Sequence, residues 1–293
     1  MSLQARYDAF DRYQQRHAWL GFPLAVHRKY GEDQGRYMAA TISYYGFFSL
    51  FPLLLVLVTL LGYLLAGNED LQKRIVDSAL SQFPVVGDEL VQGTLSGSGP
   101  ALAVGLVVSL WAGTGVVLAA ETAMDQLWGV PLARRAGFLR RRGRALLLLL
   151  VLGGGLLAAA VLSGLSTAGA DYGAVWKIGS IVLSTLLDFA LFWVGFRVLT
   201  TGDVSWRSLR GGAIAAAVAY QVLQALGGLY VSHVVKGASN VYGTFALVIG
   251  LLSWIYLATA VVLLSAEGNV VATRGLWPRS LATTERAPRR PGL

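Results

Sequence analysis

The stretch that decides the fold is YGTFALVIGLLSWIYLATAVVLLSAEGNVVAT, residues 242–273. Its first 25 residues carry no charged side chain. At a rise of about 1.5 Å per residue, they exceed the roughly 30 Å hydrocarbon core of a bilayer and so predict a membrane-spanning helix. Glu267 and Asn269 follow near the end of this helix, before Arg274. A carboxylate at that depth costs free energy unless it is paired, so Glu267 is a candidate functional residue.

The whole chain has the composition of a membrane protein. It is 55% hydrophobic and only 14% charged, against about 25% charged residues in an ordinary soluble domain. With no cysteine, it has no disulfide, no thiolate metal ligand and no cysteine nucleophile. Its 293 residues suffice for one bundle of about six helices. We expect no cleavable signal peptide, because the first thirty residues lack an apolar segment.

Apolar runs predict an all-α, polytopic bundle of six transmembrane helices. The expected spans are residues 37–66, 101–127, 145–168, 175–200, 209–234 and 242–273. Residues 1–36 predict a cytoplasmic amphipathic arm that breaks at Pro23, and residues 68–99 an amphipathic interfacial hairpin. Residues 274–293 predict a basic, disordered tail. Pro52 removes one backbone hydrogen bond from the first span and predicts a kink there.

The distribution of Lys and Arg predicts the orientation. The loop RRAGFLRRRGR, residues 134–144, holds six arginines. Alternate connections place 20 of the 24 basic residues on one side of the bilayer and 4 on the other. The positive-inside rule then puts both termini in the cytoplasm. Such a loop can also bind phosphate in RNA or in lipid headgroups. We expect contact with anionic lipid from Arg134, Arg135, Arg140, Arg141, Arg142 and Arg144.

Asp188 lies near the middle of the fourth span, at the predicted centre of the membrane. Inserting a carboxylate there costs about 2.5–3.5 kcal/mol of free energy unless it is paired or hydrated. Gln221 and Gln224 of the fifth span lie at nearly the same depth and can hydrogen-bond to this carboxylate. Asp188 is therefore either part of a substrate pathway or the centre of a structural cluster that includes Ser184.

A second polar group lies at the cytoplasmic end. Glu121 and Asp125 are four residues apart and share one helix face. This pair of carboxylates has three interpretations: the acid pair of a hydrolase, half of a cation site, or a structural pair at the helix end. Arg197 and Glu267 lie within about three helical turns of the same boundary. Pairing of Arg197 with Glu121 or Glu267 would offset the cost of burial, whether these groups form a buried network or line an inward-facing vestibule.

Three blocks of the chain resemble the YihY/BrkB family of bacterial inner-membrane proteins, once labelled ribonuclease BN. They are AATISYYGFFSLFPLLL (39–55), ETAMDQLWGV (121–130) and NVYGTFALVIGLLSWIYLATAVVLLSAEGNVV (240–271). The family pattern falls on Tyr44, Ser49, Pro52, Trp128, Tyr242, Gly243, Glu267 and Asn269. The resemblance implies an envelope protein of the inner membrane and, by proposal for some members, export or flipping of lipid-like molecules.

Two function classes follow. A transporter of lipids or other amphiphiles would use Pro52 and Gly243 for gating. Its pathway candidates are Asp188, Gln221, Gln224, Glu121, Asp125, Arg197, Glu267, Asn269, Tyr44 and Tyr242. The alternative is a non-transporting scaffold or regulator of envelope integrity, which would use these groups for packing. Membrane lipids are the expected partners, and self-association is left open.

We expect no enzyme, cofactor, metal or nucleic-acid partner. The chain has no ATP-binding loop, and a ribonuclease would need clustered His and Asp ligands that RNA can reach. The cytoplasmic loops do not offer that spacing.

Overall fold

In a computed structural model, the described residues are 3–64, 99–135, 137, 139–149, 151, 154–155, 174–230 and 244–280. Every regular element in these ranges is a helix, so the all-α fold class is confirmed. The predicted hairpin at 68–99, most of the third span, and Tyr242 and Gly243 lie outside the described residues.

Five long helices coincide with predicted spans to within four residues at each end. They are α3 (Gly35–Leu64), α5 (Gly99–Leu127), α7 (Ala174–Leu199), α8 (Trp206–Tyr230) and α10 (Thr244–Arg274). Within the described ranges, Ile181–Leu199 and Val248–Arg274 are long and apolar enough to cross a membrane. These two helices agree with the composition of a membrane protein, and the count of six spans stays a prediction.

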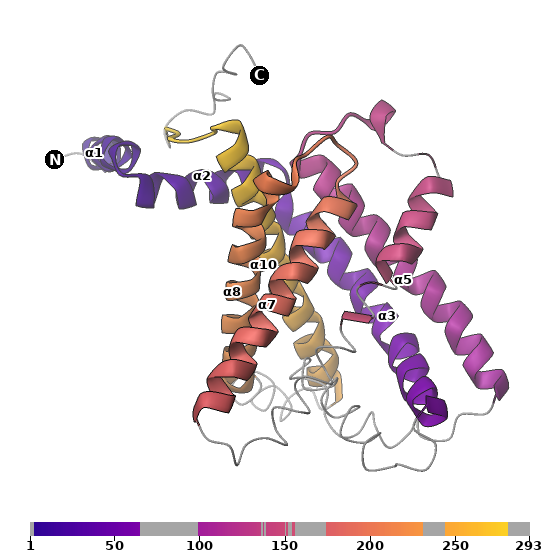
Figure 1. The fold of residues 1–293 in the computed structure, drawn as a ribbon. Helices are drawn as coiled ribbons and strands as arrows, with labels where there is room; N and C mark the ends of the chain where they lie inside the picture. Colours follow the sequence, from indigo (N-terminus) through magenta and orange to yellow (C-terminus); the bar gives the residue numbers. More distant parts are fainter. Residues whose placement is uncertain are drawn as a thin grey trace.

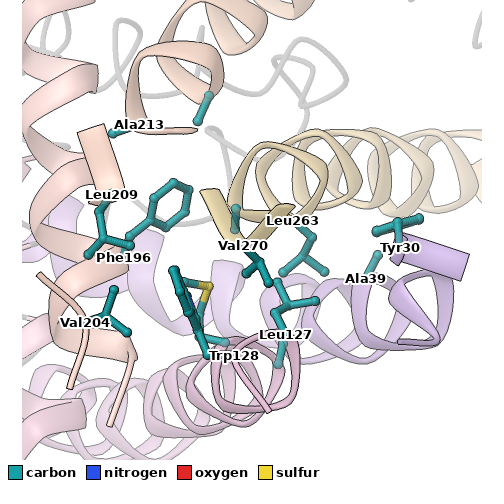
Figure 2. Close-up of a cluster of buried hydrophobic side chains, with 14 residues drawn as sticks. Tyr30, Ala39, Leu127, Trp128, Phe196, Val204, Leu209, Ala213, Leu263 and Val270 are labelled. Atoms are coloured by element: carbon teal, nitrogen blue, oxygen red, sulfur yellow. The ribbon is translucent and has the colours of Figure 1, made fainter. Parts of the chain in front are cut away.

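The helix α10 is the centre of the bundle. It packs against both α3 and α8, while α5 covers α3 and α7 covers α8 (Figure 1). The buried apolar cluster lies where α3 and α8 begin and where α5, α7 and α10 end. Figure 2 shows side chains of all five helices meeting there, with Tyr30 of α2 at one edge. Trp128, a position of the family pattern, is buried in this cluster under the guanidinium of Arg274.

Apolar side chains also form stripes on the outside of the bundle. On α8, residues 214, 218, 222 and 226 are all exposed and recur every four positions. On α7, residues 178, 181, 182 and 186 repeat at three- and four-residue steps. Ile178 is 63% exposed and Leu186 is 58% exposed. Continuous apolar faces of this kind are costly in water and favourable against hydrocarbon.

The amino-terminal arm consists of α1 (Leu3–Arg16) and α2 (Ala18–Glu32), which run across one end of the bundle (Figure 1). The predicted break at Pro23 is wrong, because Pro23 lies inside α2. The break occurs at His17, whose backbone is extended at φ −119° and ψ 104°. Five residues of α2 precede Pro23, so its missing N–H removes one backbone hydrogen bond near the start of the helix without ending it.

The first residues after α10 are held on the arm, which corrects the prediction of a disordered tail from Arg274 onward. Ser280 Oγ donates to Asp11 Oδ2 over 2.7 Å, and Gln14 Nε2 donates to the Arg279 carbonyl over 2.6 Å. Arg279 Nη1 lies 2.9 Å from Glu32 Oε2. We call these contacts the terminal clasp. The tail beyond residue 280 lies outside the described part.

The electrostatics of the clasp centre on Glu32. Burial by itself raises the pKa of the Glu32 carboxyl. The hydrogen bonds and charges of Arg279 and Arg28 outweigh that effect and leave this pKa below its usual value. Glu32 therefore stays ionised at neutral pH and holds the clasp through charge.

Candidate functional site

Three carboxylates and one amide are buried at the end of the bundle that the arm crosses. Glu121 and Asp125 come from α5, and Glu267 and Asn269 from α10. None of the four is more than 2% exposed. We call this group the polar layer. The sequence predicted its position near one boundary, and the structure assigns each member a different partner.

Glu121 pairs with an arginine of the 134–144 loop. Arg141 Nε lies 3.4 Å from Glu121 Oε2, and Arg141 Nη2 donates to Thr122 Oγ1 over 3.0 Å. The predicted pairing of Arg197 with Glu121 or Glu267 is therefore wrong. The helical segment 139–149 places Arg141 beside α5, so Glu121 already has a cation. The guanidinium of Arg197 lies instead over the ring of Trp206, 6.0 Å from its centroid.

Asp125 joins α5 to the connection between α7 and α8. Its Oδ1 accepts hydrogen bonds from Thr201 N over 2.9 Å and Thr201 Oγ1 over 2.6 Å. Arg135 Nε lies 3.9 Å from Oδ2. The two carboxylates of α5 thus each face their own arginine, which fits the structural interpretation better than a hydrolytic acid pair. No group of three or more His, Asp or Glu that could hold a metal occurs in the ranges the structure describes.

Glu267 lies where α2 crosses α10. Lys29 Nζ is 3.9 Å from Glu267 Oε2 and also contacts the Asp33 carboxylate. Neither oxygen of Glu267 accepts a hydrogen bond from a donor among the described residues, and the hydroxyl of Tyr30 has no hydrogen-bond partner there. Burial, followed by the electrostatic effect of the nearby Tyr256, raises the pKa of Tyr30 to about 12, so its hydroxyl stays protonated. The sequence reasoning missed Lys29 and Asp33. Their four-residue spacing at the end of α2 was the only available signal.

Asn269 holds α8 against α10. Its Oδ1 accepts from Gly212 N over 2.6 Å, and its Nδ2 donates to the Leu209 carbonyl over 3.1 Å. Gly212 makes this approach possible, since a Cβ there would lie 2.3 Å from the Ser265 carbonyl oxygen. This predicted pathway residue therefore has both polar atoms engaged in helix packing.

The mid-membrane contact predicted for Asp188 is present. Gln221 Nε2 donates to Asp188 Oδ2 over 2.7 Å and lies 3.3 Å from Ser184 Oγ. The amide thus bridges two residues of α7 from α8. Gln224 lies one turn further along α8 and is partly buried. This cluster lies on helices other than those that enclose the groove described next.

An open groove of about 530 Å³ lies between α3 and α5. Its wall is formed by Gln34, Tyr37, Met38, Thr41, Tyr45, Gly115, Leu118, Ala119, Thr122, Ala123, Gln126 and Arg141. Arg141 supplies its cation, and the walls are mostly apolar. The sequence reasoning chose Tyr44, but that side chain is 56% exposed and packs on Phe48, whereas Tyr45 lines the groove.

The six arginines of the 134–144 loop divide into two sets. Arg135 and Arg141 face the carboxylates of α5, and Arg144 donates to the Val198 carbonyl. Arg134, Arg140 and Arg142 are exposed. Only this second set has the exposure expected for lipid contact. The helix α3 continues through Pro52, whose gating role stays a prediction.

Comparisons with known proteins agree on a membrane-protein family. The profile of the family described as Virulence factor BrkB matches residues 26–289. A UPF0761 membrane protein of Psychrobacter is 25% identical over 94% of this chain, which covers 52% of that protein. A UPF0761 membrane protein of Acinetobacter baylyi is 23% identical over 87% of this chain and 62% of its own length.

A third relative has a different name and a similar length. The ribonuclease-like protein YfkH of Bacillus subtilis is 23% identical over 86% of this chain and 95% of its own length. The chain therefore spans about half to three-fifths of the two UPF0761 relatives and nearly all of the Bacillus protein. No solved structure matches it.

Proposed function

Because this chain belongs to the BrkB family of membrane proteins, we propose that it moves anionic lipids or other anionic amphiphiles across a bacterial inner membrane. In this proposal it has six spans and both termini in the cytoplasm. The side with 20 of the 24 basic residues is then the cytoplasmic side. The terminal clasp supports a shared side for the termini, since it holds residues 279 and 280 on the arm.

The groove between α3 and α5 is the observation that carries this proposal. Its apolar walls, with Tyr45 and Leu118, suit acyl chains, and Arg141 with Thr122 suits a phosphate or carboxylate. The exposed arginines of the same loop add a positive field that attracts anionic headgroups. The groove is open, so an amphiphile can enter without unfolding either helix.

A groove-filling variant tests the proposal. Ala119 lines the groove, so Ala119→Phe places a ring in it without changing charge. Ala215→Phe adds the same ring to an exposed position on α8 and is the matched control. The measurement is the transfer of a fluorescent phosphatidylglycerol between leaflets of proteoliposomes. We expect Ala119→Phe to lose most of the transfer and Ala215→Phe to keep it.

The role of charge is tested by Arg141→Lys against Arg140→Lys. Lysine preserves the ion pair with Glu121 but loses the planar fork that binds an anion at two points. We expect slower transfer of the anionic lipid for Arg141→Lys alone, with unchanged thermal stability in detergent. If all four variants and the wild type transfer lipid equally fast, at a rate above that of protein-free vesicles, the groove is not part of the transport pathway.

A non-transporting scaffold is the second candidate, favoured by the polar layer. Its contacts from Asp125 and Asn269 tie helices together without needing a substrate. Wild-type transfer no faster than that of protein-free vesicles would favour this function. The ribonuclease-like name belongs to the Bacillus protein, and we expect no nuclease activity here. Activity that persists through purification and disappears in Glu121→Ala would contradict this expectation.

A further inference from the structure

At the crossing of α2 and α10, two carboxylates contact one lysine. Lys29 is the only cation within 4 Å of Glu267 in the part of the chain that the structure describes, and it also contacts Asp33. The side chains of Glu267 and Lys29 are 0% and 12% exposed. One ammonium therefore interacts with two carboxylates in a largely buried site.

The other cations nearby do not pair with Glu267. Glu32 of α2 lies near Glu267 but is paired with Arg28 and Arg279 in the clasp. On α3, Arg36 acts on Tyr30, and Tyr256 of α10 does so as well. Two neutral phenols add no charge. An ionised carboxylate buried without a hydrogen bond costs several kcal/mol, so taking up a proton is the favourable solution.

We propose that Glu267, Lys29 and Asp33 form a proton-binding site in which Glu267 carries a proton while Lys29 pairs with Asp33. Three observations support it: the complete burial of Glu267, the absence of a hydrogen-bond donor to either of its oxygens in the described ranges, and the lysine shared with Asp33. On release of the proton to water, the Glu267 carboxylate competes with Asp33 for the ammonium. The contact between α2 and α10 then changes.

The site lies next to residues that line the groove. The carbonyl of Asp33 accepts a hydrogen bond from Gln126 Nε2 of α5 over 2.8 Å, and Gln126 lines the groove. The following residue, Gln34, also lines the groove and has a positive φ of 59° in the turn between α2 and α3. A shift of Asp33 therefore reaches the groove through two neighbours. This link to transport rests on the proposed function, whereas proton binding does not.

Infrared titration of the purified protein tests proton binding directly. We expect wild type to show a protonated carboxyl band above about pH 5, where an ordinary glutamate is ionised. The isosteric Glu267→Gln should lose this band. Glu32→Gln is the matched control and should keep it. Wild type without such a band, or Glu267→Gln with the band unchanged, would overturn the proposal.

Two further variants test the assignment of the band to Glu267 by the direction in which they shift its titration midpoint. Lys29→Met removes the ammonium and should raise the midpoint of the band by about 1–3 pH units. Asp33→Asn removes the competitor, leaves Lys29 to Glu267 and should lower the midpoint. A midpoint that does not respond to either change would contradict a shared lysine. Thermal stability in detergent, measured for each variant, identifies any loss of fold.

Lipid transfer measured across pH separates this inference from the proposed function. We expect wild-type transfer to change near the infrared midpoint and Glu267→Gln to lose that dependence. A titrating band without any lipid transfer supports the proton site and removes the proposed function. Transfer whose pH dependence survives in Glu267→Gln overturns the coupling.

Discussion

Replacing Gly212 by alanine is expected to push α8 away from α10. A Cβ at residue 212 would lie 2.3 Å from the Ser265 carbonyl oxygen and 2.4 Å from Asn269 Nδ2. Real side chains do not approach so closely, and a carbonyl of the helix backbone cannot turn away. The helices must separate, and both hydrogen bonds of Asn269 to α8 must lengthen.

The expected loss of stability is the sum of two effects. Overpacking a tight interface costs about 1–3 kcal/mol. Losing two interhelical hydrogen bonds in a membrane protein adds about 0.6 kcal/mol for each. The total is roughly 2–4 kcal/mol of unfolding free energy, before the small gain in helix propensity that any glycine-to-alanine change brings.

The neighbouring glycine provides the matched control. A Cβ at Gly211 would lie 3.7 Å from Asn269 Oδ1, which is an ordinary contact. Gly211→Ala should therefore be neutral or stabilising by up to about 1 kcal/mol, since it gains the same helix propensity. Reversible unfolding in mixed detergent and dodecyl sulfate measures both variants. Equal stability of the two would refute the close packing of α8 on α10.

Two more predictions concern contacts between segments that are distant in the sequence. Thr201→Val removes a hydroxyl donor from the buried Asp125 carboxylate and should cost about 1.5–3 kcal/mol in the same assay; Thr185→Val, whose hydroxyl bonds within its own helix, should cost much less. Because the pKa of Glu32 is lowered by folding, its pairing with Arg279 stabilises the clasp above the usual glutamate pKa of about 4.3, and this contribution is lost as the pH falls through the lower folded pKa. A spin label on residue 278 should become more mobile in acid, and an Arg279→Ala protein that keeps the wild-type acid response would contradict this assignment.

Helix positions were predictable from the sequence because the apolar runs are long and their exposure to water would be costly. The ends of α3, α5 and α7 lie within two residues of the predicted spans. Buried carboxylates were equally visible, since Glu121 and Glu267 stand out in apolar surroundings. A carboxylate inside a long apolar run can be recognised from its neighbours in the sequence alone.

Partners were much less predictable, because they depend on how helices are rotated and on segments far apart in the chain. The cation beside Glu267 is Lys29, which comes from α2 at the other end of the sequence. Tyr44 and Tyr45 are adjacent but about 100° apart around the helix axis, and only Tyr45 lines the groove. Asp188 was the exception, since matching depth on neighbouring spans was enough to find Gln221.

Cysteine labelling tests the membrane arrangement most directly, because the wild-type chain contains no cysteine. Arg140→Cys lies in the exposed part of the arginine loop, and Ile214→Cys lies on an apolar face of α8, at a residue that is 54% exposed. With a membrane-impermeant maleimide, we expect Arg140→Cys to react only in inside-out vesicles and Ile214→Cys to react in neither orientation until detergent is added. Reaction of Arg140→Cys in right-side-out vesicles, or of Ile214→Cys in intact vesicles, would contradict a bundle embedded in lipid with its polar layer at the cytoplasmic face.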